Sequence, residues 1–446
     1  MELAMMTIGK LDFSDKNHVI VQSMTNTDTN DVAATVEQIK ELVDAGCEMV
    51  RITVPSMKEV PALREIKQRI RAVGIETPLV ADVHFLPQVA EACTEIVEKV
   101  RINPGNYVDK RNFQHLELTE EEYQSSLQAM LHKARPLFEK CRVHGTALRI
   151  GVNHGSLCDR IVSKYGNTPY AMAMSAKEWI DICQQCDFQK IVLSMKSSNV
   201  NTMIESTRIL HKIMQESGRI YPLHIGVTEA GAGDEGRVKS AAGIGALILD
   251  GIGSTIRVSL TESPVNEIPV ARLLANLPQY RNQVESNMVG DTLHIRFHEH
   301  DRESWMVVTA AFAGHWHIHQ SFRNIVVENR YASPAECQNL AELILQACRI
   351  RMTRTEIISC PSCGRTQYDI QGTLAAVKNR FGHFPNLKIG VMGCVVNGPG
   401  EMADADFGIV GCHAGKVAVY RQKERLTPPL SIEDALDELE KFIKNQ

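Results

Sequence analysis

The sequence lacks several features that would indicate a membrane, secreted or nucleic-acid-binding protein. No apolar run reaches the roughly 18 residues that a membrane-spanning helix needs. The first six residues have neither a basic start nor a long apolar core, so we expect no signal or transit peptide. The net charge is −5, which gives no support for nucleic-acid binding. Any anionic ligand must therefore be bound by a local group of basic side chains.

The sequence also lacks internal repeats, low-complexity tracts and the glycine-rich fingerprint of a dinucleotide-binding fold. It does contain twelve cysteines. In the absence of a secretory signal these indicate a reducing compartment with free or metal-bound thiols, and we expect a cytoplasmic protein. With 446 residues, of which 44% are hydrophobic and 23% charged, the chain is long enough for two or three domains with cores of their own.

Short apolar strands alternate with amphipathic helical segments from Val19 to Leu274. The predicted strands span residues 19–24, 49–53, 79–82, 99–102, 147–151, 190–194, 223–226 and 255–259. Eight strand–helix units in about 255 residues have the size of a (β/α)8 barrel. An open, doubly wound sheet is the alternative, but the sequence lacks the glycine-rich dinucleotide-binding fingerprint that would support it. The pattern therefore predicts an α/β fold with a TIM barrel over residues 1–274.

Basic side chains recur where the predicted strands end. These residues are Arg51, Arg101, Arg149, Lys196 and Arg257. A single one of them is most simply explained by a surface ion pair. In a barrel, however, the carboxyl ends of all strands meet at one mouth. Four arginines and a lysine at that mouth predict an anionic ligand, a phosphate or diphosphate.

Two glycine-containing stretches follow predicted strands, at residues 103–106 and 228–236. Loops of this kind often expose backbone N–H groups to a phosphate. We interpret both as phosphate-type loops, although each alone is a weak signal because loops are rich in glycine anyway.

Residues 275–339 fit neither the barrel pattern nor the segment that follows, and we interpret them as a small inserted α+β unit or spacer. Polar and apolar residues alternate in parts of this region. One such part contains His315, His317 and His319, which would lie on one face of a strand. A solvated or interface face is the favoured interpretation of the three histidines, and a metal site is the alternative.

Residues 340–446 predict a compact α+β domain with ligand loops at its strand ends. Cys360 and Cys363 form a CxxC pair, Cys394 follows after thirty intervening residues, and Glu401 stands seven positions beyond it. Three thiolates leave one metal position for chemistry or for a weaker ligand such as Glu401. Thiolates select zinc or iron–sulfur clusters.

The spacing of these cysteines favours a cluster over zinc. Structural zinc sites usually show two close ligand pairs, whereas here one pair is joined by a single distant cysteine. Zinc with Glu401, His383 or His413 as its fourth ligand is the alternative. A second CxxC pair, Cys183 and Cys186, ends a helical segment, and we expect buried, inert thiols there.

The chain resembles the family of 4-hydroxy-3-methylbut-2-enyl diphosphate synthases, enzymes of the methylerythritol phosphate route to isoprenoids. The resemblance lies in residues 21–26, 80–85, 100–106, 226–231, 360–363 and 393–401, of which the last two stretches are the most specific. It implies a barrel similar to that of dihydropteroate synthase, joined to a sulfite-reductase-like cluster domain. The amino-acid sequence also resembles the longer form of the family, but with a shortened insert.

The resemblance further implies a reaction and a site. The reaction is the two-electron reductive dehydroxylation and ring opening of 2-C-methyl-D-erythritol 2,4-cyclodiphosphate, with flavodoxin or ferredoxin as the electron donor. A 4Fe-4S cluster would be bound by Cys360, Cys363 and Cys394, with Glu401 as a labile fourth ligand. The implied substrate-binding residues are Arg51, Arg101, Arg149, Asn153, Lys196, Ser259 and Asn397. Those implied near the reacting carbons are Asp82, His84 and Glu229, together with Glu401.

Two other functions stay open on the residues alone: a cluster-dependent dehydratase without net redox chemistry, and a non-enzymatic iron–sulfur carrier or sensor. Electron consumption per turnover distinguishes the dehydratase. A carrier normally keeps four cysteines on its cluster and has no need of a basic barrel mouth. Short members of the family are homodimers, so the cluster domain could close on its own barrel or on a partner's.

Overall fold

The computed structural model describes residues 6–108, 115–366, 368–395, 398–402, 404–413 and 415–445. The chain divides into two compact units. The first unit comprises Met1–Lys196, Thr202–Ile225 and Ile252–Arg257, and the second comprises Ser197–Asn201, Gly226–Gly251 and Val258–Gln446. Within the described ranges, no helix has both the length and the apolar character required to cross a membrane.

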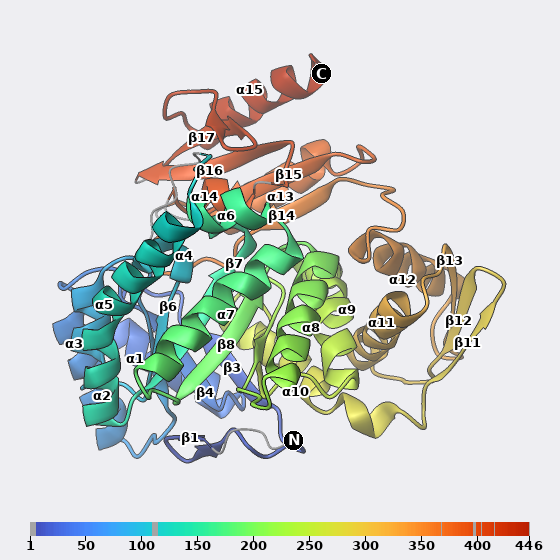
Figure 1. The fold of residues 1–446 in the computed structure, drawn as a ribbon. Coiled ribbons are helices and arrows are strands. Elements are labelled where there is room, and N and C mark those ends of the chain that lie inside the picture. The colour runs from blue at the N-terminus through green and yellow to red at the C-terminus, as the bar shows by residue number, and fades with distance from the viewer. Residues whose placement is uncertain are drawn as a thin grey trace. The chain divides into compact units, whose positions relative to one another are not determined.

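The first unit contains eight parallel strands that close into a barrel (Figure 1). They are β3 (Ile20–Met24), β4 (Met49–Thr53), β5 (Leu79–Asp82), β6 (Lys99–Ile102), β7 (Ala147–Asn153), β8 (Ile191–Lys196), β9 (His224–Ile225) and β10 (Thr255–Ile256). The order is β8-β7-β6-β5-β4-β3-β10-β9, and a parallel bridge between Leu193 and Leu223 joins the two ends. The predicted TIM barrel is therefore confirmed, with strands close to the predicted positions.

Helices follow most of these strands. They are α1 (Val32–Asp44), α2 (Val60–Ala72), α3 (Pro87–Cys93), α4 (Pro104–Tyr107), α5 (Glu120–His144), η1 (His154–Ser156), α6 (Asp159–Tyr165), α7 (Pro169–Gln185) and α8 (Val200–Glu216). Local sequence sets their ends. Thr119 and Glu122 form a capping box at the start of α5, and α5 ends at Gly145, whose φ of +68° favours glycine.

A short hairpin closes the amino-terminal end of the barrel. It consists of β1 (Thr7–Ile8) and β2 (Leu11–Asp12). Ile8 and Phe13 are buried in a cluster with Ile20, Met49 and Val80, which lie in the first halves of their strands. Because this end is filled by apolar side chains, a ligand site is expected at the opposite end, where the strands finish.

The second unit begins with helical elements and a small three-stranded sheet. Its elements up to residue 347 are α9 (Gly233–Leu249), η2 (Pro264–Asn266), α10 (Glu267–Ala275), η3 (Leu277–Tyr280), β11 (Glu285–Val289), β12 (Thr292–Arg296), α11 (Arg302–His319), β13 (Asn324–Glu328) and α12 (Pro334–Ala347). The sheet has the order β11-β12-β13, antiparallel in its first pair and parallel in its second.

The strand predicted around His315, His317 and His319 is wrong, because these residues form the last turns of α11. The helix begins where the carboxylate of Asp301 accepts the amide N–H of Ser304. Its middle consists of buried small and apolar residues, which stabilise a helix against a neighbouring element. Alternation over five residues was thus too short a signal to separate a strand from a helix end.

The two predicted phosphate-type loops are also partly helical. Residues 104–107 form α4, which Asn103 caps by accepting the N–H of Gly105. Helix α9 begins at Gly233, so the end of the second stretch is its first turn, where Asp234 and Glu235 suit the positive end of the helix dipole.

A mixed five-stranded sheet ends the second unit. Its elements are β14 (Glu356–Ser359), α13 (Ile370–Phe381), β15 (Lys388–Met392), α14 (Gly398–Glu401), β16 (Phe407–His413), β17 (Lys416–Arg421), β18 (Glu424–Arg425) and α15 (Ile432–Lys444). Strands β14, β15 and β16 are parallel, and β17 and β18 are antiparallel additions. Helices α13 and α15 pack on one face, in a cluster that includes Val391 and Val419. The predicted C-terminal α+β fold is confirmed.

Glu356, at the start of β14, forms a buried ion-pair network in the second unit. Its carboxylate lies 2.8 Å from Nζ of Lys239 and 3.0 Å from a guanidinium nitrogen of Arg349. Burial alone would raise the pKa of Glu356, but Lys239 and Arg349 lower it to about 2.

This network predicts a pH dependence of stability. In the unfolded chain Glu356 has its ordinary pKa of about 4.5, whereas in the folded protein its pKa is about 2. Its contribution to the free energy of unfolding is therefore complete above pH 4.5 and is lost as the pH falls towards 2. Between pH 6.5 and 4 the wild type should lose about 0.8 kcal/mol more unfolding free energy than Glu356→Gln. Chemical denaturation at several pH values measures this difference. Glu433→Gln, an exposed change in α15, should keep the wild-type slope, and an equal slope in Glu356→Gln would contradict the assignment.

Candidate functional site

Five basic side chains from the barrel strands, or from the residue directly after a strand, gather in the first unit. They are Arg51, Arg101, Arg149, Lys196 and Arg257, and all but Arg51 are buried. Burial, followed by the charges of Arg149 and Arg51, holds the pKa of Lys196 well below its usual value. The cations are thus close enough to repel one another, so the structure brings these predicted residues together.

Asp82 and His84 lie among these cations. A carboxylate oxygen of Asp82 accepts a hydrogen bond of 3.0 Å from Arg101, and the other lies 3.4 Å from Nε2 of His84 and 3.9 Å from Nε of Arg51. Burial alone would raise the pKa of Asp82, but Arg101 and Arg51 hold it well below the usual value. Asp82 is therefore an anion that orients its basic neighbours.

The guanidinium group of Arg149 is the least satisfied of the group. The side chain is 1% exposed, and its Nε and Nη1 have no hydrogen-bond partner within the described residues. A buried cation without acceptors is costly, and here Arg51 and Arg101 add like-charge repulsion that, after burial, lowers the pKa of Arg149. An anionic ligand would supply both the missing acceptors and the missing charge.

Gly151 makes room for one of these arginines. A Cβ atom at this position would lie 2.6 Å from Nε of Arg101, too close for van der Waals contact. We therefore expect Gly151→Ala to displace the Arg101 side chain and to weaken diphosphate binding by about tenfold or more, the equivalent of one charge-assisted hydrogen bond. Calorimetric titration with inorganic pyrophosphate measures this effect. Unchanged affinity would show that Arg101 does not contact the ligand.

The other predicted substrate-binding residues differ in what the structure says of them. Asn153 ends β7 and is buried in the first unit, whereas Ser259 is buried in the second. Asn397 lies outside the described residues. The sequence analysis missed Met24, whose sulfur lies 2.9 Å from a guanidinium nitrogen of Arg51 and 3.6 Å from one of Arg257. A methionine carries no charge signal, so its contacts with the two arginines could not be predicted, although it lies in the stretch 21–26 that carries the family resemblance.

The predicted ligand cysteines lie at one edge of the five-stranded sheet in the second unit. Cys360 directly follows β14 and Cys394 comes shortly after β15, and these strands are parallel neighbours. The N–H of Gly393 donates a hydrogen bond of 3.1 Å to Sγ of Cys360. Cys363 follows Ser362, whose φ of +68° turns the chain, and a guanidinium nitrogen of Arg365 lies 3.9 Å from its sulfur. Topology therefore brings the two separate cysteine segments to the same edge.

Glu229 lies beside this cysteine edge within the second unit. Its backbone carbonyl accepts the N–H of Ser359 at 3.3 Å, one residue before Cys360. The residue has a left-handed φ of +50° and is buried. Burial and then the neighbouring carboxyl group of Glu401 raise the pKa of Glu229 well above the usual value. Two acids from distant segments, Glu229 and Glu401, thus meet near the cysteines.

Thr261 forms hydrogen bonds at the end of β14, next to Cys360. Its hydroxyl group lies 2.7 Å from that of Ser359 and donates a hydrogen bond of 3.1 Å to the backbone carbonyl of Cys360. A parallel bridge between Ala230 and Ser359 adds a second connection. The end of β14 is therefore fixed next to Cys360, the first of the predicted ligand cysteines.

The donor set at this edge fits an iron–sulfur cluster. It offers three half-buried thiols and the carboxyl group of Glu401, which ends the single helical turn α14. Thiols are the ligands that iron–sulfur clusters and zinc select, and N–H donors to sulfur together with a nearby arginine stabilise thiolate ligands. Of the second CxxC pair, Cys183 is buried in α7 as predicted, whereas Cys186 is only half-buried.

Sequence comparison relates the chain to known proteins. Residues 4–272 match the profile of the GcpE TIM-barrel domain, and residues 356–445 match that of the GcpE protein C-terminal domain. The chain is 35% identical to the 4-hydroxy-3-methylbut-2-en-1-yl diphosphate synthase (flavodoxin) of Phocaeicola vulgatus, over 99% of this chain and 97% of that protein. It is 34% identical to the protein of the same name from Chlamydia pneumoniae, over 98% of this chain and 94% of that protein.

The alignment with the Phocaeicola vulgatus protein extends over 597 positions, although this chain has 446 residues. That relative therefore contains residues without a counterpart here. Among solved structures, the dihydropteroate synthase of Burkholderia cenocepacia matches 63% of this chain and 100% of its own, with a TM-score of 0.40 and 12% identity. A likeness of that strength has no bearing on function.

Proposed function

Since the chain belongs to the GcpE family, we infer that it converts 2-C-methyl-D-erythritol 2,4-cyclodiphosphate into 4-hydroxy-3-methylbut-2-enyl diphosphate in isoprenoid biosynthesis. The reaction is a reductive dehydroxylation with ring opening, catalysed by an iron–sulfur oxidoreductase. The observation that carries the proposal is the buried guanidinium group of Arg149, whose Nε and Nη1 lack acceptors among the described residues and which lies within a group of cations. Such a site suits the diphosphate of this substrate.

We propose that the basic group at the strand ends binds this diphosphate. Arg149 and Arg101 would donate charge-assisted hydrogen bonds to its oxygens, and Lys196 would add a point charge. Each such bond is worth about 1.5–3 kcal/mol. Arg51, Asn153, Ser259 and Asn397 are further predicted contacts. Asp82 would keep Arg101 and His84 in place, since its carboxylate bonds to Arg101 and faces His84.

The cysteine edge is the proposed site of electron delivery. A 4Fe-4S cluster bound by Cys360, Cys363 and Cys394, with Glu401 as a labile fourth ligand, would supply single electrons and a Lewis-acidic iron. Glu229 is held by Ser359 next to this edge. We propose that its carboxyl group delivers a proton to the departing hydroxyl oxygen. Asp82 and His84 would lie near the reacting carbons.

We propose three parts for the chain: a barrel over residues 1–274, an insert over 275–339 and a cluster domain over 340–446. The family profiles support this division, because they leave residues 273–355 between them. Flavodoxin is the proposed electron donor, since the relatives carry it in their names. The free thiols are consistent with the cytoplasm as the proposed location.

Anaerobic turnover tests the proposed function. Cluster-loaded protein, reduced flavodoxin and the cyclic diphosphate should give the linear hydroxybutenyl diphosphate, identified by mass spectrometry. Omission of the reductant should stop product formation. A dehydrated product formed without any reductant would instead indicate a dehydratase and overturn the proposal.

A further inference from the structure

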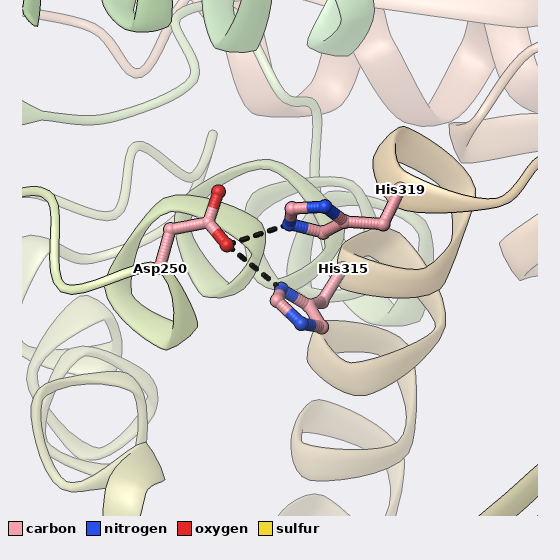
Figure 2. Close-up of side chains that lie close together, drawn as sticks. All are labelled: Asp250, His315 and His319. Carbon is pink, nitrogen blue, oxygen red and sulfur yellow. Dashed lines mark hydrogen bonds and ion pairs between the residues drawn. The ribbon is translucent and has the colours of Figure 1, made fainter.

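A cluster of two histidines and one aspartate lies in the second unit, among residues to which the proposed function gives no role. Figure 2 shows Asp250 with both imidazole rings directed at its carboxylate. Oδ1 of Asp250 lies 2.7 Å from Nε2 of His319 and 3.4 Å from Nδ1 of His315. The two ring centroids are 4.6 Å apart. One ligand atom from each residue lies within 4.8 Å of the other two.

The two histidines share a helix face, and the aspartate ends a neighbouring helix. His315 and His319 are four residues apart in the last turns of α11, so they project from the same side. Asp250 is the C-cap of α9. His317, between the two, packs edge-on against Phe322, with ring centroids 5.9 Å apart. The helical period therefore explains why two of the three histidines, His315 and His319, face Asp250.

Close packing holds α9 and α11 in this arrangement. A Cβ atom on Gly314 would lie 2.2 Å from the backbone oxygen of Ala242, and one on Gly245 would lie 2.3 Å from Cβ of Ala311. The helices therefore touch through small residues, and the positions of the side chains one turn further on are well determined. A metal site needs such preorganised ligands.

The electrostatic setting favours a cation. Helices α9 and α11 both end at this cluster, and a helix C-terminus carries partial negative charge. Asp250 adds a full negative charge. Arg281 donates a hydrogen bond to the carbonyl oxygen of Leu249 and opposes this attraction. Metals bind the neutral form of imidazole, which keeps a lone pair for the ion.

We propose that Asp250, His315 and His319 bind a divalent transition-metal ion, with Zn²⁺ as the first candidate and water at the remaining position. Two imidazoles and a carboxylate are borderline ligands that suit zinc, unlike the thiols of the cysteine edge. With metal–ligand bonds of about 2.1 Å, tetrahedral geometry places ligand atoms about 3.4 Å apart. The contact between Asp250 and His315 already has this length, and the contact with His319 must widen slightly. The ion would join α11 to the end of α9.

Zinc binding to the holoprotein tests this site. Tag-free, cluster-loaded protein is incubated anaerobically with Zn²⁺ and gel-filtered, and zinc and iron are then counted by mass spectrometry. We expect one zinc ion per chain with no loss of iron. Asp250→Asn and His319→Gln should each weaken zinc binding by at least roughly 10- to 100-fold. The loss of an outer-shell partner already has an effect of this size, and these two residues are proposed as direct ligands. The control is His144→Gln, which removes an exposed histidine in the last turn of α5 and should leave zinc binding unchanged.

X-ray absorption at the zinc edge gives a second readout that needs no variant. Nitrogen and oxygen ligands at about 2.0–2.2 Å are expected, whereas sulfur at about 2.3 Å would place the ion on cysteines. Sulfur ligation overturns the proposal, as does failure of the wild type to retain zinc. Zinc retained equally by Asp250→Asn and His319→Gln would overturn it too, and the three side chains would then form ion pairs alone.

Discussion

Cys394→Ser is expected to remove the iron–sulfur cluster and with it all measurable conversion of the cyclic diphosphate. Cys394 comes shortly after β15, and Cys360 directly follows β14, the parallel neighbour of β15. It is the one proposed thiol ligand outside the CxxC pair, and two thiols are too few to hold a cluster of four irons. Iron and sulfide content, visible absorbance and turnover measure the loss.

The matched control for this variant is Cys186→Ser, which changes a thiol of the other CxxC pair at the end of α7. This change should leave iron content and turnover at wild-type levels. A colourless but fully active Cys394→Ser protein would contradict the cluster assignment. An equal loss in both variants would indicate a general effect of thiol removal.

Arg149→Gln is expected to weaken binding of the cyclic diphosphate by about 10²–10⁴-fold, since Nε and Nη1 would each lose a charge-assisted bond of about 1.5–3 kcal/mol. The same change should leave the ligand-free protein as stable as the wild type, or more stable. It removes a buried charge that Arg51 and Arg101 repel and that has unsatisfied nitrogens. Loss of affinity without loss of stability distinguishes a binding residue from a structural one.

Calorimetric titration and thermal unfolding measure the two sides of this prediction. The control is Arg69→Gln, which removes an exposed cation of α2 that pairs with Glu65, and neither affinity nor stability should change much. Wild-type affinity in Arg149→Gln would remove Arg149 from the substrate site. A strong fall in its melting temperature would show that the guanidinium group already has structural partners.

The barrel could be predicted because its strands are short and apolar and alternate with helical segments. Strands such as β4 and β5 are buried almost throughout, so their sequences are near-continuous hydrophobic runs that end in polar residues. The convergence of Arg51, Arg101 and Arg149 followed from topology, since parallel strands of a barrel end at one mouth. The cysteine spacing likewise pointed to the edge of the C-terminal sheet.

Other features depend on contacts between residues far apart in the chain, which the spacing of residues along the sequence does not reveal. The meeting of Glu229 with Glu401 joins segments far apart in the chain. The helix around His315 overrode an alternating pattern, because its neighbours Ala311 and Gly314 pack tightly against α9. The role of each proposed site residue in binding or catalysis stays a prediction, since position alone does not establish chemistry.

Anaerobic metal analysis of the purified chain, with a visible spectrum recorded before and after addition of the cyclic diphosphate, tests the central claim most directly. The claim is that one chain joins a basic diphosphate site to an iron–sulfur centre. We expect about four iron and four sulfide per chain, and a spectrum of the reduced protein that changes when substrate is added. Zinc at the thiols with no iron, or an iron–sulfur spectrum that the substrate leaves unchanged, would contradict it.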